Sequence, residues 1–456
     1  MAEFDRGLIH YFTASANGFT LADFREGYMK NKVLLILAIL LSAVSVSGVW
    51  AGEAEFQKKL KEFISIALAN NPELLEAQNR IKSSREVPSQ AGSLDDPILK
   101  FELKNLPVDT FKFGQEAMTQ KQVTISQKLP YPGKLGLRTD MANKDVGIAE
   151  ETHDDLKLRI IRDVKQSYFE LCFVLAAIEI TQQNKKLLEQ FVTIAETKYS
   201  VGKGIQQDVI KAQVELSKII DKLIALNKRK ETEQGKLNTL MNLLPQTPLR
   251  ISHGITKSSF NYKIEELQKL TEEHRPVLEQ IRLLKERYQV ARKLAQKDYY
   301  PDFNVGFRYG QREDGRVNGI TQNHPDFVSG FVGINIPIWY KTKQRRKVAE
   351  QSYRIDTAQE TYNKVRNQIF LNIKTLMDQE AKSSKTLELI KTAILPQARQ
   401  SLESSLSGYG VDKVDFLSLL DTQVTLLDWE IKYHRELADY EQTLADLEQA
   451  VGKSLF

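Results

Sequence analysis

Apolar and polar residues alternate along four short stretches of the chain, at residues 99–104, 123–129, 303–309 and 328–336. A period of two residues predicts β-strands that each have one apolar and one polar face. A polar loop separates the first two stretches, and another separates the last two. Strands of this kind occur both in a half-buried soluble sheet and in a membrane barrel, where the apolar face meets lipid.

Most of the remaining chain has the apolar spacing of a long coiled coil. Apolar residues step alternately by three and four along residues 161–178, and the same rhythm returns at 212–226 and 420–434. A helix over about 140–198 would be roughly 85 Å long at ~1.5 Å per residue, which is more than a compact bundle needs. The pattern therefore predicts long antiparallel helical hairpins.

The same landmarks recur in the same order in the two halves of the chain. Each half opens a helical segment with a proline and has a second proline 25 residues later: Pro72 and Pro97, then Pro276 and Pro301. Further on, Tyr199 corresponds to Tyr409, and the offset between the halves grows from 204 to 210 positions. Ordered landmarks with small insertions between them indicate an internal duplication.

Each predicted repeat contains a helix, a β-hairpin and a helical hairpin. The first structural repeat is placed at residues 52–250, with its β-hairpin at about 97–130 and its helical hairpin at about 135–245. The second repeat covers the rest of the chain. Its limits are 251–456, with a β-hairpin at about 301–338 and a helical hairpin at about 342–453.

A short apolar stretch lies near the N-terminus. Two lysines precede the apolar residues 33–46 and small residues follow, which predicts a signal peptide at 29–51. Cleavage is favoured over a membrane anchor because the apolar core is shorter than the ~20 residues of a spanning helix. Gly52 follows the expected cut, so a lipid-anchored cysteine is not indicated. Residues 1–28 are an unexplained leader. They would result from a start site assigned upstream of Met29, or would be a short cytoplasmic tail if the apolar stretch is a membrane anchor.

Beyond residue 51 no run of 18 apolar residues occurs, so any crossing of a membrane has to be made by β-strands. Four alternating strands behind a signal peptide favour a barrel over a soluble sheet. Four aromatic residues border the second predicted hairpin, where a barrel has its interface girdle: Tyr299, Tyr300, Trp339 and Tyr340.

Composition excludes several classes of function. The 64 basic and 59 acidic residues are spread along the chain, so no nucleic-acid partner is expected. The single cysteine, Cys172, and six scattered histidines offer no metal-ligand spacing. No zinc-protease, P-loop or dinucleotide motif is present. The sequence therefore predicts neither an enzyme nor a protein with a cofactor or metal.

Acidic residues gather near the predicted reversals of the helical hairpins, at Asp208, Asp412, Asp415 and Asp421. A ring of carboxylates at a pore mouth attracts cations and repels anions. Acids at a helix start, favoured by the helix dipole, explain the same positions equally well.

Taken together, these residues resemble the TolC family of bacterial outer-membrane efflux ducts over residues 55–453. The marks are the helix-opening prolines, the turn at 199–203 with Asp208 and Val209, and the second turn from the approach at 396–409 to Asp421. The resemblance implies a mainly α fold with a small β part. Three chains would form a homotrimer, with four strands per chain in an outer-membrane β-barrel that continues as a long periplasmic α-helical coiled-coil barrel.

The same resemblance implies partners and a location. A periplasmic adaptor (membrane fusion) protein would meet the helical turns, an inner-membrane pump of the resistance-nodulation-division type would supply the energy, and the barrel would contact outer-membrane lipid. The protein would lie in the bacterial outer membrane and extend into the periplasm. The adaptor-contact turns would be Val201, Gly202, Lys203 and Gly204, and Gly410, Val411, Asp412 and Lys413.

In that family a tyrosine, a basic residue and two aspartates around the second turn close the periplasmic end. The matching positions here hold Tyr409, Val414, Ser418 and Asp421, so two of the four differ. The closing network must then differ, with Asp415, Lys413 or Asp208 as substitutes. The candidate constriction at the pore entrance is Tyr409, Ser418, Asp421, Asp208 and Asp415.

Residues 96–107 and 127–134 are similar to the heavy-metal branch of the family, which implies efflux of heavy-metal cations. The expected function is a passive exit duct of a tripartite efflux or type I secretion system. Two alternatives stay open. One is a periplasmic coiled-coil scaffold without a pore, and the other is a standalone diffusion porin, which has no use for helices of this length.

Overall fold

The structure is a computed structural model that describes residues 56–251, 254–317 and 320–455. The predicted leader at 1–28 and signal peptide at 29–51 lie outside the described residues. Residues 60–456 form one compact unit. Among the described helices, none is both long and apolar enough to span a membrane.

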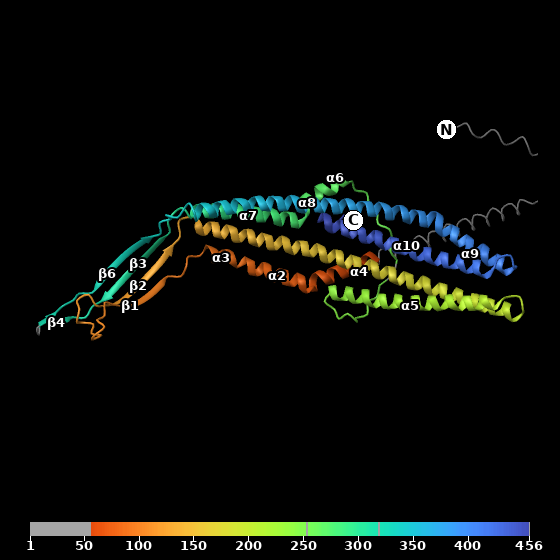
Figure 1. Cartoon of the computed structure of the whole chain (residues 1–456), viewed down its shortest axis with the longest axis horizontal. Coiled ribbons are helices and arrows are strands. Elements are labelled where there is room, and N and C mark those ends of the chain that lie inside the picture. The colour runs from red at the N-terminus through yellow and green to blue at the C-terminus, as the bar shows by residue number, and fades with distance from the viewer. Residues whose placement is uncertain (1–55, 252–253, 318–319, 456) are drawn as a thin grey trace, which may run out of the picture. The chain divides into compact units, whose positions relative to one another are not determined.

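An antiparallel sheet of four strands, in the order β1-β2-β3-β6, occupies one end of this unit (Figure 1). The strands are β1 (Ile98–Lys104), β2 (Gln120–Leu129), β3 (Phe303–Gln311) and β6 (Phe327–Ile334). They fall on the four alternating stretches of the sequence. The two hairpins join through β2 and β3, where Ile125 lies opposite Phe307.

The register places most apolar residues of the four strands on one face, whereas Ile98, Phe327 and Phe331 lie on the other face. Phe101 lies opposite Val123, and Tyr309 lies opposite Val328. These side chains remain open to solvent in the single chain, with Phe101 72% exposed. A pair of short strands, β4 (Gly315–Val317) and β5 (Ile320–Gln322), adds a small second sheet that the sequence pattern did not predict.

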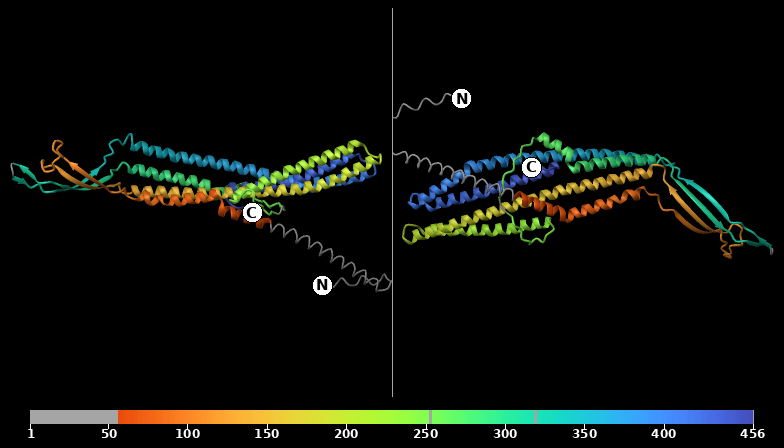
Figure 2. Two further views of the ribbon diagram at one scale, coloured as in Figure 1. Left: turned by 90° about the horizontal axis from the view of Figure 1, so that it is seen from below. Right: turned by 180° about the vertical axis from the view of Figure 1, so that it is seen from behind.

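Helices make up the rest of the unit (Figures 1 and 2). The predicted first repeat contains α2 (Pro72–Arg85), α3 (Val87–Gly92), α4 (Lys134–Ser200) and α5 (Gln206–Leu240). The second contains α6 (Ile264–His274), α7 (Pro276–Lys297), α8 (Gln344–Leu389), the π-helical turn η1 (Ile390–Ile394), α9 (Leu395–Gly410) and α10 (Phe416–Val451).

Helix α4 is the central element of the unit. It packs against α7 and the short α2 and α3 near the sheet, and against α5 and α10 toward the turns. Val164, Tyr168 and Leu171 of the predicted seam are buried. At the first position of the seam, Ile160 is buried and Ile161 is only half-buried. Buried residues on the turn side, such as Leu188, Phe191 and Leu419, form a core that holds both helical hairpins together.

The outgoing helix of the second repeat differs from α4 by an interruption. Residues 344–410 match α4 in length, but they contain η1 and then Pro396. Proline has no N–H to donate, and its ring clashes with the carbonyl four residues earlier in a regular helix. A wider π turn just before the proline relieves this conflict.

Candidate functional site

The two turns at which the helical hairpins reverse have the same backbone. In the first turn the N–H of Lys203 donates to the carbonyl of Lys198 at 2.8 Å. In the second turn the N–H of Lys413 donates to the carbonyl of Gly408 at 2.9 Å. These residues are 210 positions apart, the same offset that separates Tyr199 from Tyr409.

Both turns need one residue in the left-handed region. That residue is Gly202 in the first turn, with φ of 71°, and Asp412 in the second, with φ of 59°. Glycine adopts this conformation freely, and aspartate is among the few other residues that tolerate it. The aspartate therefore places a carboxylate where the first repeat has none.

A second pair of positions approaches closely in each turn, and one member of each pair is glycine. In the first turn Lys198 faces Gly204, where an added Cβ would lie 3.1 Å from the Cβ of the lysine. In the second turn the glycine is on the other side, because Gly408 faces Val414 and an added Cβ would lie 2.5 Å from its Cγ2. The first turn can therefore carry a lysine where the second cannot.

Lys198 connects the two turns. Its Nζ lies 2.8 Å from the carbonyl oxygen of Tyr409 and 2.5 Å from Oδ1 of Asp412. The same ammonium lies 4.0 Å from the centre of the Tyr409 ring, within the range of a cation–π contact. We call these contacts of Lys198 with Tyr409 and Asp412 the Lys198 clasp.

Tyr409 is anchored beneath the clasp. Its side chain is buried and meets the ring of Phe416 edge to face, with 5.6 Å between the ring centres. Burial raises the pKa of the Tyr409 hydroxyl, and the nearby charges of Asp208 and Asp412 raise it further. The hydroxyl therefore stays neutral in the physiological range.

The carboxylates around the clasp are in different environments. The hydrogen bond and the charge of Lys198 lower the pKa of Asp412. Asp208 is half-buried in the first turn of α5, and burial together with the charge of Asp415 raises its pKa, although Lys198 acts in the opposite direction. Of these two candidate residues, Asp208 is thus the one that takes up a proton first as pH falls.

Two further candidate residues, Asp415 and Ser418, form the cap at the start of a helix. Asp415 is the N-cap of α10 and accepts hydrogen bonds from the N–H of Ser418 at 2.9 Å and from its hydroxyl at 2.7 Å. These bonds lower the pKa of Asp415. Asp421 lies one turn further along α10, is exposed, and forms no ion pair or hydrogen bond with another residue in the described part of the chain.

The residues expected to contact an adaptor lie on the surface of the turns. Val201 and Val411, at equivalent positions, are both 63% exposed. All of this set except the half-buried Gly204 are exposed: Val201, Gly202, Lys203, Gly410, Val411, Asp412 and Lys413. Each turn thus presents a valine beside a lysine.

The sequence reading did not identify Lys198. One feature of the sequence could have indicated such a lysine. Val414 stands where the family that the chain resembles has a basic residue, so the missing positive charge had to come from another part of the turns. Lys198 lies next to the landmark Tyr199, and the corresponding residue of the second turn is Gly408. Only the structure shows that its side chain crosses from the first turn to the second.

Within the described residues, no group of three or more histidine, cysteine or acidic side chains is placed to hold a metal ion. Cys172 lies buried in α4.

Comparisons with known proteins agree with this geometry. The chain is 22% identical over 413 residues to the cobalt-zinc-cadmium resistance protein CzcC of Cupriavidus metallidurans, covering 90% of this chain and 94% of that one. It is 22% identical over 314 residues to the toxin and drug export protein A of Aggregatibacter actinomycetemcomitans, covering 67% of each.

Solved structures share the fold. The outer-membrane channel OprN superimposes with a TM-score of 0.73 at 16% identity, covering 88% of this chain and 92% of that chain. CusC gives a TM-score of 0.72 at 15% identity, covering 87% and 92%. The family model described as outer membrane efflux protein matches residues 63–243 and 267–453. The chain therefore belongs to the outer membrane efflux protein family.

Proposed function

We propose that three copies of this chain form the exit duct of a tripartite efflux system in the bacterial outer membrane, extending into the periplasm. The observation that carries this proposal is the four-stranded sheet with one exposed apolar face. Phe101 and Val332 on that face are 72% and 70% exposed, which is uncommon for a face left in water. Lipid is the surrounding that suits such a face.

The edges of the sheet support assembly. Strands β1 and β6 are its outer strands, so each has one unpaired side within the described chain. Unpaired backbone groups are costly inside a bilayer, and pairing β6 of one copy with β1 of the next closes the sheet. Three copies of four strands then give a barrel of twelve strands.

The opposite face of the sheet suits a water-filled interior. Gln122 and Thr124 alternate with the apolar residues of β2, and Nε of Arg308 donates to Oγ1 of Thr124 at 3.3 Å. A polar interior and an apolar exterior are the arrangement of an aqueous pore. The duct would then conduct passively, with the energy supplied by a pump of the inner membrane.

The turns are proposed to be the regulated entrance and the docking point for a periplasmic adaptor. The Lys198 clasp joins the two turns of one chain and supplies the positive charge that Val414 cannot. Breaking the contact of Lys198 with Asp412 would free the second hairpin to move away. The exposed valines and lysines of the turns are the surface that an adaptor would contact.

Heavy-metal cations are the proposed cargo. The similarity to a cobalt-zinc-cadmium resistance protein extends over 90% of the chain. Asp208, Asp415 and Asp421 near the entrance would favour cations. A duct does not have to bind its cargo, so this proposal requires no metal-ligand cluster.

Planar-bilayer recording of the detergent-purified protein tests the proposal. We expect trimers that open cation-preferring channels, and cells without the gene should become sensitive to divalent metals only when the partner pump is present. A protein that stays soluble without detergent and opens no conductance would instead be a periplasmic scaffold. Metal sensitivity that does not depend on a pump would identify a standalone porin.

A further inference from the structure

The apolar face of the sheet borders a strongly basic segment. Strand β6 leads into Ile336, Ile338 and Trp339, which are 69%, 64% and 71% exposed. Residues 341–347 then follow with the sequence Lys-Thr-Lys-Gln-Arg-Arg-Lys, which has five basic residues and no acid. We call residues 336–347 the junction segment.

The basic side chains of the junction segment are largely unpaired. Lys341, Lys343, Arg345 and Arg346 are exposed, and within the described chain none of them forms an ion pair. Lys347 is the exception, since its Nζ lies 2.8 Å from Oδ2 of Asp298. An exposed lysine or arginine normally needs no partner. The location of these side chains, and not their lack of partners, is therefore what indicates a binding site.

Three of these charges are in an unfavourable position. Arg345, Arg346 and Lys347 lie in the first turn of α8, where no acidic residue is present. The N-terminus of a helix carries partial positive charge, so cations there are destabilising and an anion is favourable. The fold thus concentrates positive charge where it repels itself unless an external anion is bound.

The first repeat shows that the turn does not need this charge. The positions equivalent to 341–347 are 131–137, which contain only one basic residue, Lys134. That lysine is buried and paired with Asp298 and Asp302. The exposed basic cluster is therefore a property of the second repeat and is not required to start a long helix.

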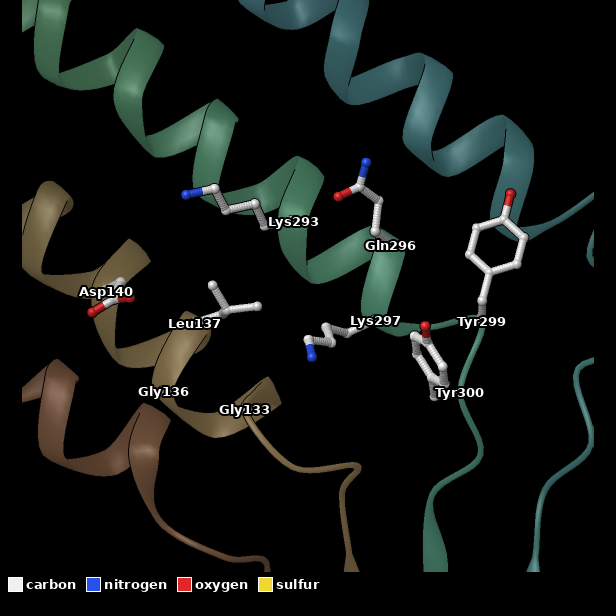
Figure 3. Close-up of a pocket in the computed structure, with 9 residues that line it drawn as sticks. All are labelled: Gly133, Gly136, Leu137, Asp140, Lys293, Gln296, Lys297, Tyr299 and Tyr300. Atoms are coloured by element: carbon white, nitrogen blue, oxygen red, sulfur yellow. The ribbon is translucent and has the colours of Figure 1, made fainter.

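A cavity between α7 and the first turns of α4 lies near the junction segment and is lined by two lysines (Figure 3). It has a volume of about 780 Å³, and Figure 3 shows Lys293 and Lys297 of α7 around it, across from the first turns of α4. Nζ of Lys297 lies 5.3 Å from the ring centre of Tyr131 and 5.9 Å from that of Tyr300. Asp140 is its one acidic lining residue.

Two contacts join the cavity and the junction segment into one surface. The ion pair of Lys347 with Asp298 ties the start of α8 to the end of α7. The ring centres of Tyr299 and Tyr340 lie 6.4 Å apart. Exposed aliphatic residues, aromatic rings and unpaired cations therefore follow one another along a single surface at the end of the sheet.

We propose that this surface binds the headgroups of anionic phospholipids in the leaflet that surrounds the helical end of the sheet. The isoleucines and Trp339 would enter the acyl region, and the lysines and arginines would contact the phosphates. A free phosphate ion would use the cations but leave the apolar side chains exposed to water. The inference rests on the proposed function, because it needs the sheet to lie in a membrane.

Titration of the detergent-purified trimer with phosphatidylglycerol and phosphatidylcholine, followed by native mass spectrometry, tests the proposal. We expect phosphatidylglycerol to bind at least about tenfold more tightly. Two variants should lose that preference: K341Q/K343Q/R345Q/R346Q at the junction segment, and K293Q/K297Q at the cavity. The matched control K186Q/K228Q/K385Q/K391Q removes four exposed lysines from the helices and should bind like the wild type.

Several results would overturn the proposal. One is equal binding of phosphatidylglycerol by the wild type, the junction-segment variant and the cavity variant. Another is displacement of the lipid by inorganic phosphate alone, and a third is wild-type binding that added salt does not weaken. Loss of the trimer in lipid-free detergent, in the junction-segment and cavity variants but not in the control, would assign the charges to a contact between copies instead.

Conductance separates this proposal from the proposed function. Channels that open in phosphatidylcholine bilayers without any preference for the anionic lipid would reject the headgroup site and keep the duct. An absence of conductance in bilayers of either lipid would reject the duct itself.

Discussion

At the residue scale, the second helical turn depends on a lysine from the first. Val414 occupies the place where a local cation would be expected, and its side chain leaves no room for a residue larger than glycine at position 408. Lys198 reaches Asp412 from the other turn because Gly204 makes space for it. One chain thus closes its two hairpins on each other with residues from both repeats.

Asp412→Asn should weaken the clasp without disturbing the turn. Asparagine tolerates the left-handed conformation, and its amide can accept a hydrogen bond but cannot form the ion pair with Lys198. We expect a higher conductance or open probability in planar bilayers. Lys413→Gln changes the charge of the same turn without touching a described partner and is the control. Wild-type conductance of the asparagine variant would show that the clasp does not hold the entrance closed.

Gly408→Ala tests the close approach in the second turn. The added Cβ collides with Val414, so we expect a loss of stability of about 1–3 kcal/mol. Adding Val414→Gly, which copies the arrangement of the first turn, should recover much of that loss. Thermal unfolding in detergent gives the coupling between the two sites, and strictly additive effects would argue against the proposed contact.

The raised pKa of Asp208 predicts a pH dependence of selectivity. Burial and the charge of Asp415 raise it, so Asp208 becomes neutral at a higher pH than an ordinary aspartate as pH falls. As pH falls, protonation of Asp208 should therefore cause the first decrease in cation preference. Reversal potentials measured along a pH series should show this step in the wild type and lack it in Asp208→Asn. Asp421→Ala should reduce cation preference at neutral pH.

At the element scale, one buried lysine locks the sheet to the helices. Nζ of Lys134, at the start of α4, lies 3.2 Å from Oδ1 of Asp298 and 2.8 Å from Oδ1 of Asp302. Asp302 also accepts a hydrogen bond from the N–H of Tyr131 at 2.8 Å. The end of α7, the start of β3 and the start of α4 are thereby held at one point.

Lys134→Met should be strongly destabilising, because two partly buried carboxylates would lose their shared cation. Breaking a buried ion pair from one side costs about 3–5 kcal/mol. Lys144→Met removes an exposed pair with Glu286 at the same interface between α4 and α7, and we expect that change to cost less than ~1 kcal/mol. Chemical unfolding of the two variants in detergent compares them, and equal losses would contradict the special role of Lys134.

The elements differ in how far the sequence could predict them. The strands were readable because each exposes one apolar face, which leaves a period of two in the sequence. Helix α4 was readable from its spacing, and it begins at Lys134, next to the start predicted for the helical hairpin at about 135. The turn η1 was not, since a π turn arises from the conflict around Pro396 and has no periodicity of its own. Strands β4 and β5 are three residues each, too short to show any alternation.

At the scale of the whole molecule, the predicted duplication accounts for what could be read from the sequence and for what could not. Similarity between the repeats identified the turns and the acidic residues near them. The Lys198 clasp joins positions 198 and 412, which are distant in sequence. The corresponding positions of the other repeat, Gly408 and Gly202, are both glycine. A contact of this kind is visible only when both hairpins are placed in space. Ser418 likewise became a partner in a helix cap once its bonds to Asp415 were known.

The two faces of the sheet predict opposite responses to a new charge. Phe101→Arg places a guanidinium on the apolar face and should reduce folding into lipid bilayers by about 2–4 kcal/mol. Ser126→Arg puts the same side chain on the polar face of β2 and should have a much smaller effect. Folding into vesicles, followed by resistance to unfolding in urea, measures both. Similar losses in the two variants would argue against a lipid-facing surface.

In each turn a glycine faces a larger side chain, Lys198 in the first turn and Val414 in the second. This close approach limits the order in which the two turns could have diverged. A chain that holds a large side chain at both facing positions of one turn would pass through a strained intermediate, whereas a chain with glycine at both would not. The route from the lysine and glycine of the first turn to the glycine and valine of the second therefore runs through a double glycine. The close contact therefore favours an order of substitution in which one side chain is lost before the other is gained.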